Sequence, residues 1–208
     1  MTEKDKNGLK KFQSAVQDKN LEMVNSLLKS GSDVNERNYS NSAPIHLAVQ
    51  KGDLKILKTL VENGADLEAQ DSEGYTVLHL AVFKNDLKAV DFLISKGAKI
   101  SSVDRNGITP LQHSFISNHI EIFEFLIKHQ RTQIMPLLVD AVRSDKINMV
   151  KILLNIVEAC MDTKAINEIR MVLLYSAVKN NNIEMVKLLI VNKANLEAGY
   201  TDPSKTRI

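Results

Sequence analysis

The sequence predicts an all-α solenoid of stacked helix-turn-helix units, each carrying a protruding β-hairpin finger, on three observations. A small residue returns every 33 positions, at Ala15, Ala48, Ala81 and Ser114. An apolar pair follows each small residue after 12 positions, at Leu27–Leu28, Leu60–Val61, Leu93–Ile94 and Leu126–Ile127. A glycine then closes the first three units, at Gly31, Gly64 and Gly97. Positions that recur in phase indicate a repeat architecture, in which each unit buries its apolar face against the next.

The second unit indicates each element in turn. Pro44 begins a first helix, because the first turn tolerates a missing N–H. Ala48 is small enough to let two helices approach closely. Asp53 caps a second helix whose leucines recur at helical spacing, and Gly64 ends that helix in a left-handed conformation. The polar stretch ADLEAQDSEGYT between units predicts the finger. The same cap position holds the good caps Asn20, Asp86 and Asn182 and the poorer caps His119 and Lys146.

Two further units keep the internal spacing but disturb the period. Ala141 and Ala177 each precede an apolar pair by the same 12 residues. However, Ala141 lies 27 residues after Ser114, and Ala177 lies 36 residues after Ala141. We therefore expect intact helix pairs joined by altered links. The link KHQRTQIMPLLVDA is too short for a full finger, and the second helix of the fifth unit is expected to continue through NIVEAC.

These units resemble the ankyrin repeat, whose pattern is a D-x-x-G hairpin, then T-P-L-H-x-A, then a second helix ending L-L-x-x-G-A-D. The third unit, DSEGYTVLHLA…FLISKGAKI, fits nearly throughout, with Val77 where proline is usual. The fourth, DRNGITPLQHS, has Gln112 in the histidine position and His113 one place late. The second, NYSNSAPIHLA, has Asn38 and Asn41 in place of the Asp and Gly. The resemblance covers about residues 7–198, and it implies that the T-P-L-H histidines bond to the finger backbone, at His46 and His79.

The expected organisation is a single ankyrin-repeat domain over residues 1–208. Its repeats are expected at about 7–36, 37–69, 70–102, 103–132, 133–165 and 166–198. The last residues, 199–208, read as the start of a further repeat, with Thr206 in the threonine position. We therefore expect the chain to be the N-terminal portion of a longer protein. A natural terminus with a frayed tail is the alternative.

Composition and motifs exclude several function classes. A net charge of +2 gives no argument for nucleic acid or an anionic membrane as partner. No run approaches the roughly 18 apolar residues of a membrane span, and the N-terminus lacks the apolar segment of a signal peptide. The single cysteine, Cys160, excludes an intrachain disulfide and suits a reducing compartment. We expect a soluble, intracellular, cytoplasmic protein that is monomeric in isolation.

No combination of residues predicts an enzyme. Phosphate-binding glycine loops and metal-ligand spacings are absent from the sequence, so we expect no cofactor and no metal. Cys160 falls on an apolar helix end, which is typical of an inert buried thiol rather than a nucleophile. We therefore expect no catalytic residue in this chain.

The resemblance places partner binding on the concave face, formed by the finger tips and the exposed side of each first helix. Carried over by position, the apolar candidates are Tyr39, Tyr75, Phe83, Ile108 and Ile116. The polar candidates around them are Arg37, Lys51, Glu73, Lys84 and Arg105. Aromatic anchors with a polar rim are typical of a binding hot spot, and Phe83 is the first anchor to test. The same first-helix positions in the last two units hold Arg143, Ser144, Lys179 and Asn180.

Three functions remain open. The first is a protein–protein interaction scaffold that holds a partner protein or peptide on its concave face. The second is a targeting or substrate-recruiting arm of a larger protein, such as a pathogen or symbiont effector delivered into a host cell, with catalysis outside this chain. The third is an inhibitor resembling the NF-κB-inhibiting ankyrin proteins. The sequence does not name the partner, because this fold separates architecture from specificity.

Overall fold

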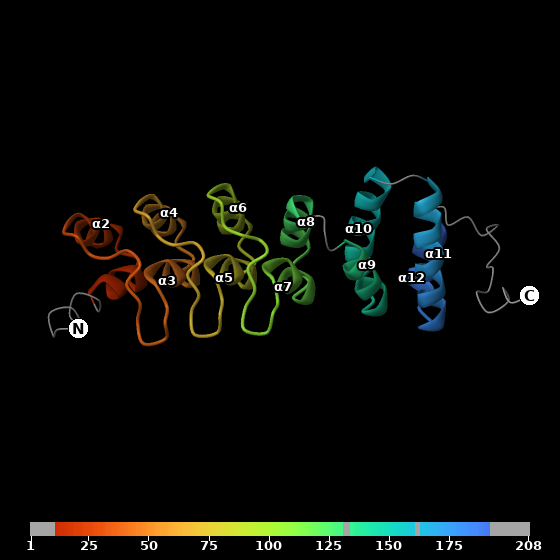
Figure 1. Ribbon diagram of the computed structural model, residues 1–208, viewed down its shortest axis with the longest axis horizontal. Coiled ribbons are helices and arrows are strands. Elements are labelled where there is room, and N and C mark those ends of the chain that lie inside the picture. The colour runs from red at the N-terminus through yellow and green to blue at the C-terminus, as the bar shows by residue number, and fades with distance from the viewer. Residues whose placement is uncertain (1–10, 131–133, 161–162, 192–208) are drawn as a thin grey trace, which may run out of the picture. The chain divides into compact units, whose positions relative to one another are not determined.

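The computed structural model describes residues 11–130, 134–160 and 163–191 (Figure 1). The chain divides into two compact units, residues 1–130 and residues 131–208. Within the described residues every regular element is a helix and none is a strand, so the predicted all-α class is confirmed. No helix in these ranges is long and apolar enough to cross a bilayer.

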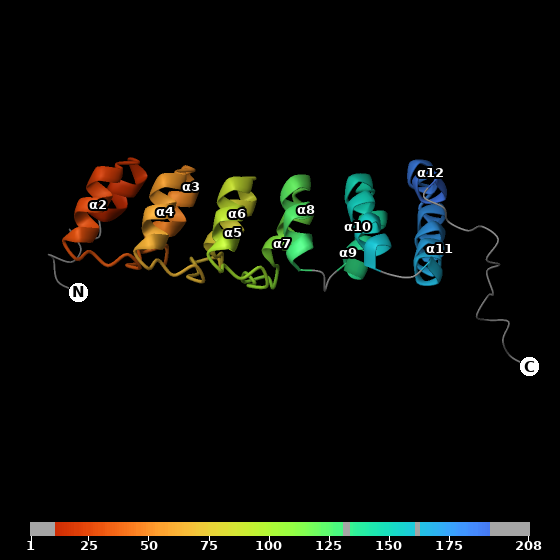
Figure 2. The same cartoon turned by 90° about the horizontal axis from the view of Figure 1, so that it is seen from above.

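The first unit is a series of antiparallel helix pairs. It begins with a helical segment at residues 11–17. The named helices that follow are α2 (Leu21–Lys29), α3 (Pro44–Lys51), α4 (Leu54–Glu62), α5 (Val77–Phe83), α6 (Leu87–Ser95), α7 (Pro110–Ile116) and α8 (Ile120–His129). First helices stack on first helices, as α3 on α5 and α5 on α7, and second helices on second helices (Figure 2). Figure 1 shows the fingers extending past the row of first helices.

The turn between the two helices of each pair has the same backbone in both units. The residue before each cap has a positive φ between 53° and 66°, at Lys19, Gly52, Asn85, Asn118, Asp145 and Asn181. The N–H of the following cap residue then bonds back to the carbonyl of the small residue, as Asp53 N to Ala48 O at 3.1 Å and Asn182 N to Ala177 O at 3.0 Å. This is the left-handed closure that satisfies the orphan carbonyls of a helix end. This recurring position was not predicted from the sequence, although five of its six residues are Gly, Asn or Asp.

The predicted caps and stops are confirmed. Asn20, Asp53, Asp86 and Asn182 accept bonds from backbone N–H groups in the first turn of the helix that each precedes. His119 makes no side-chain cap bond, and its Nδ1 lies 2.8 Å from Val82 O instead. The stop glycines have φ of 89°, 86° and 92°, at Gly31, Gly64 and Gly97, a conformation that a Cβ disfavours.

The fingers are hydrogen-bonded turns. Two backbone bonds close each, such as Asp71 N to Tyr75 O and Gly74 N to Asp71 O, both at 3.1 Å. Each finger also bonds to the next, for example Arg105 N to Glu73 O at 3.2 Å. These isolated pairings are too few for a ladder, which explains why none of the described finger residues forms a strand. In the first finger Asn38 replaces the usual Asp by accepting bonds from Ser40 N and Ser42 N, and Asn41, with φ of 54°, replaces the usual Gly.

Two buried histidines lock the fingers to the first helices, as the resemblance implied. His79 Nδ1 accepts from Thr76 N at 3.1 Å, so its Nε2–H donates to Ile108 O, also at 3.1 Å. His46 does the same between Ala43 N and Ala69 O. Burial lowers the pKa of both imidazoles, which keeps them neutral. The glutamine in this position of the fourth repeat, Gln112, keeps only the first contact, accepting from Thr109 N at 2.9 Å.

The second unit contains the helices α9 (Ile134–Arg143), α10 (Ile147–Cys160), α11 (Thr163–Lys179) and α12 (Ile183–Val191). Helix α9 pairs with α10, α11 pairs with α12, and α11 packs on α9. As predicted, α10 continues through residues 155–160. Only four residues separate α8 from α9 and two separate α10 from α11, which leaves no room for a finger. The predicted further repeat with Thr206 lies outside the described residues, and the six repeat boundaries stay a prediction.

Candidate partner-binding surface

All ten candidate binding residues lie in the first unit. Six of them are well exposed there, namely Arg37, Lys51, Glu73, Lys84, Arg105 and Tyr39, the last with 92% of its surface accessible. Ile116 ends α7 and is 58% exposed, whereas Phe83 ends α5 and is only 37% exposed. Tyr75 and Ile108 are half-buried. The structure therefore leaves polar side chains available around an apolar centre that is partly packed already.

Phe83 is partly covered because two other rings, those of Tyr75 and His113, pack against it. We call Tyr75, His79, Phe83 and His113 the aromatic cluster. The Phe83 ring meets Tyr75 edge-on at 4.9 Å between centroids and His113 at 4.4 Å. His113 also lies 5.7 Å from His79. The interpretation of Phe83 as a fully exposed anchor is thus refined, because one side of its ring is fixed against neighbours from two repeats.

A buried hydrogen bond joins one ring of this cluster to a carboxylate in the finger. His113 Nε2 lies 2.9 Å from Asp104 Oδ2, and Asp104 is only 5% exposed. Asp104 Oδ1 also accepts from Ile108 N at 3.0 Å and Asn106 N at 2.8 Å. Burial alone would raise the pKa of Asp104, but the Ile108 N–H, His113 and the Asn106 N–H outweigh it and hold that pKa below its ordinary value. The carboxylate thereby joins the finger turn to the ring of His113.

The signal for His113 was visible in the sequence, one place beyond the usual histidine. That shift turns the imidazole from the following repeat's finger toward its own finger and the preceding helix.

Burial, then the charges of Asp104, Glu73 and Asp71, raise the pKa of Tyr75. Its phenol therefore stays neutral and able to donate a hydrogen bond across the physiological pH range.

Two candidate residues have surroundings that differ from those expected. Arg37 Nη1 donates to Gln70 O at 2.6 Å, so its guanidinium also supports the next finger. Tyr39 takes part in none of the ring contacts found among the described residues. It is a single exposed ring at a finger tip, apart from the aromatic cluster.

In the parts of the chain that the structure describes, no group of three or more His, Cys, Asp and Glu side chains could hold a metal ion. Cys160 ends α10, but its side chain lies outside the described part. The predicted inert thiol therefore stays a prediction.

Comparison with known proteins agrees with this architecture. Residues 12–104 match the family model for ankyrin repeats in three copies. No curated protein matches the chain. The matched stretch contains the first three helix pairs, both histidine locks and the fingers that Asn38 and Asp71 organise. Sequence pattern, fold and family model together identify residues 12–104 as ankyrin repeats.

Proposed function

We propose that this protein is an interaction scaffold that binds a partner protein or peptide on the concave face of its first unit. Ankyrin repeats are in general protein–protein interaction modules, and they are typically non-catalytic. The observation that carries the proposal is the aromatic cluster together with Ile116. It offers apolar surface at the ends of two neighbouring first helices, beside the exposed side chains of Lys84 and Arg105.

The packing of Phe83 supports a binding role. Its ring contacts with Tyr75 and His113 hold the exposed part in one orientation. A side chain that is ordered before binding loses little conformational entropy when a partner arrives. Aromatic side chains held in this way make effective anchors, and the neighbouring Ile116 enlarges the apolar contact.

The rim gives the expected partner a charge preference. Lys51, Lys84 and Arg105 are exposed cations among the candidates, whereas Glu73 is the exposed anion among them. A partner with apolar side chains flanked by acidic residues fits this arrangement best. Rim charges mainly raise the association rate, so binding is expected to slow as salt is added.

The test compares a Phe83→Ala/Ile116→Ala variant with a Met23→Ala/Met135→Ala control in quantitative affinity capture. Met23 and Met135 are similarly exposed, at 41% and 40%, but lie outside the surface. We expect the partner retained by the wild type and the control to be lost by the first variant, with an affinity reduced by about tenfold or more. The melting temperature of both variants should remain close to that of the wild type.

Two results would contradict the proposal. One is equal retention of the partner by both variants. The other is unfolding of the Phe83→Ala/Ile116→Ala variant, which would mark these positions as core. The single Ile116→Ala variant, at the more exposed position, then decides whether the surface binds.

The remaining two hypotheses make different predictions. A recruiting arm requires a catalytic domain elsewhere in a longer reading frame. An inhibitor resembling the NF-κB-inhibiting ankyrin proteins requires measurable binding to a Rel-type domain. The scaffold is favoured over both because it needs only the surface that the first unit presents.

A further inference from the structure

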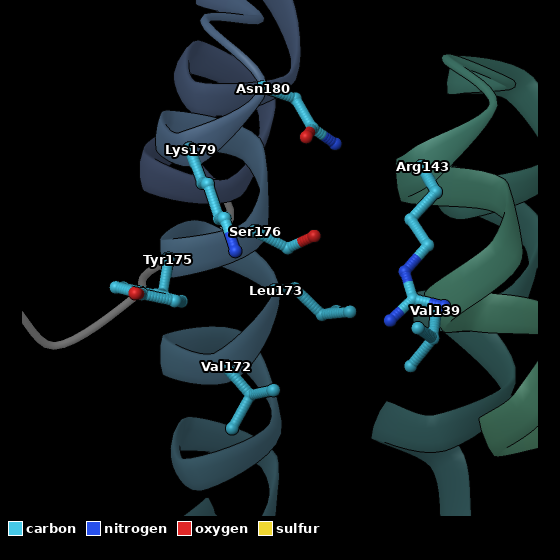
Figure 3. Close-up of a pocket in the computed structure, with 8 residues that line it drawn as sticks. All are labelled: Val139, Arg143, Val172, Leu173, Tyr175, Ser176, Lys179 and Asn180. Carbon is cyan, nitrogen blue, oxygen red and sulfur yellow. The ribbon is translucent and has the colours of Figure 1, made fainter.

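The second unit contains a pocket between α9 and α11 with a volume of about 440 Å³ (Figure 3). Arg143 and Val139 line it from α9. Leu173, Ser176 and Lys179 are among the residues that line it from α11. Figure 3 shows the Arg143 guanidinium and the side chains of Leu173 and Ser176 directed into the space between the two helices. Helices α9 and α11 pack directly on one another, so the pocket belongs to one unit.

The two cations of the pocket occupy an equivalent position in their repeats. Arg143 is the last residue of α9 and Lys179 the last of α11, each two residues after the small residue of its helix. We call this the helix-end position. In the third and fourth repeats the helix-end position holds Phe83 and Ile116. The same geometry that displays apolar side chains there displays positive charge here.

Among the described residues, neither cation takes part in an ion pair. The ion pairs among the described residues are formed by His113, Lys128 and Arg170. None of the residues that line the pocket is acidic. Two cations that share a space without a counter-ion repel each other, and an anionic ligand relieves that repulsion.

The remaining walls favour a ligand that is also apolar. Leu173 is 1% exposed and Val139 is half-buried, so the pocket has an apolar side next to the exposed cations Arg143 and Lys179. Ser176 and Asn180 add a hydroxyl and an amide that can donate hydrogen bonds.

We propose that this pocket binds an acidic peptide segment of a partner protein. One carboxylate meets the planar guanidinium of Arg143, which suits two-point contact, and a second meets the ammonium of Lys179. An apolar side chain between them rests against Leu173 and Val139. The volume falls within the range of ligand pockets and is sufficient for such a segment. The site goes beyond the proposed function, because it uses other residues in the other unit.

The test measures the fluorescence anisotropy of a labelled peptide that alternates Glu and Leu, and of the same peptide with Gln for every Glu. We expect the Glu peptide to bind the full chain and the Gln peptide to bind far more weakly. Arg143→Gln/Lys179→Gln should weaken the binding of the Glu peptide by about tenfold or more, because charged hydrogen bonds are lost. The matched control is Lys151→Gln/Lys187→Gln, which removes two exposed cations from α10 and α12 and should leave binding within about twofold.

Several outcomes would overturn the proposal. Equal weakening by the two double variants would mean attraction to net charge alone. Equal binding of the Glu and Gln peptides would exclude carboxylate recognition, and tighter binding of oligothymidylate would indicate a nucleic-acid surface instead. Circular dichroism checks the fold of each variant, and the single Lys179→Gln variant repeats the test at the more flexible cation. Phe83→Ala/Ile116→Ala should not change the binding of this peptide, so either proposal can fail without the other.

Discussion

Both units are built from the same kind of helix pair, but they join successive repeats differently. In the first unit, finger side chains reach the next repeat: Arg37 donates to Gln70 O, and Gln70 donates to Val103 O at 2.8 Å, each over 33 residues. In the second unit the described polar contacts between helix pairs are Asn182 Nδ2 to Asp145 Oδ1 and the ion pair between Arg170 and Glu158. The helix pair is therefore separable from the finger, and a repeat can lose its finger while keeping its hydrophobic stacking.

Surface chemistry differs at the same place in the repeat. The helix-end position carries Phe83 and Ile116 in the third and fourth repeats but Arg143 and Lys179 in the second unit. Backbone geometry decides where a side chain is displayed, and the residue type decides what it can bind. One architecture thus presents two surfaces of different chemistry along one chain.

The largest expected effect comes from substitutions that remove a core side chain from one unit at a time. Leu93 in α6 and Leu153 in α10 occupy the same repeat position and are both fully buried. Leu93→Ala and Leu153→Ala should each cost about 2–5 kcal/mol of unfolding free energy, through lost burial and a cavity. Because finger bonds support only the first unit, we expect two urea transitions, the earlier one belonging to the second unit.

Hydrogen exchange along the urea series assigns each transition to its residues. Leu153→Ala should move only the earlier transition and Leu93→Ala only the later one. A single transition that both variants shift equally would show that the units fold as one, as repeats with strong nearest-neighbour coupling do.

A smaller effect on stability is expected from substitutions at the contact between neighbouring fingers. Gly74 has φ of 82°, and a Cβ there would lie 2.7 Å from Arg105 N in the next finger. Gly107 has φ of 74°, and a Cβ there would meet nothing within 4 Å. Both Gly→Ala variants bear the cost of a left-handed residue, about 1–2 kcal/mol. Gly74→Ala should lose about 1–3 kcal/mol more, because the next finger has to shift.

Thermal or urea unfolding of the two variants gives this difference directly, with Gly107→Ala as the control. Equal destabilisation would mean that the fingers yield to each other without cost. The stacked fingers would then contribute little to the stability of the first unit.

The smallest effect is a pH dependence that the histidine locks confer on the first unit. Burial holds the pKa of His46 and His79 below the ordinary 6.5, so at mildly acidic pH the unfolded chain binds protons that the folded chain does not. This stability is fully present above pH 6.5 and falls as the pH drops through 6.5 toward the folded pKa values. Urea midpoints at several pH values between 8 and 5 measure it.

His79→Gln is the informative variant, because Gln112 already fills this position in the fourth repeat. The variant should be less stable at neutral pH, since the bond to Ile108 O is lost, but its stability should change less with pH. An unchanged pH profile would mean that His79 does not resist protonation. The second unit contains no histidine, so its transition serves as an internal reference.

Much of the fold was predictable because its signals are local and repeated. The cap residues, the stop glycines and Pro44 at a first turn each act within one helix end, and the 33-residue period places them in register. The helix in place of a finger after Leu154 followed from Val157 in the position of the stop glycine. The left-handed residue before each cap was missed, because Lys, Gly, Asn and Asp share that conformation without sharing a sequence signature.

The candidate site was predictable only in outline. Position in the repeat located Phe83 and Ile116 on exposed first-helix ends. It gave no indication that Phe83 would pack on His113, whose ring is turned by a buried carboxylate nine residues earlier at Asp104. It also did not indicate that Arg37 would be engaged by the carbonyl of Gln70.

The sequence by itself determined the repeat, the helix pairs and the residues on display, since these depend on short-range backbone preferences and on a period read from one chain. Tertiary structure alone decided which displayed residues meet. Phe83, Tyr75 and His113 come together, and Arg143 and Lys179 line one pocket, only because successive repeats stack. Contacts between repeats depend on the distance and orientation of two helices, and neither quantity is encoded in any single repeat.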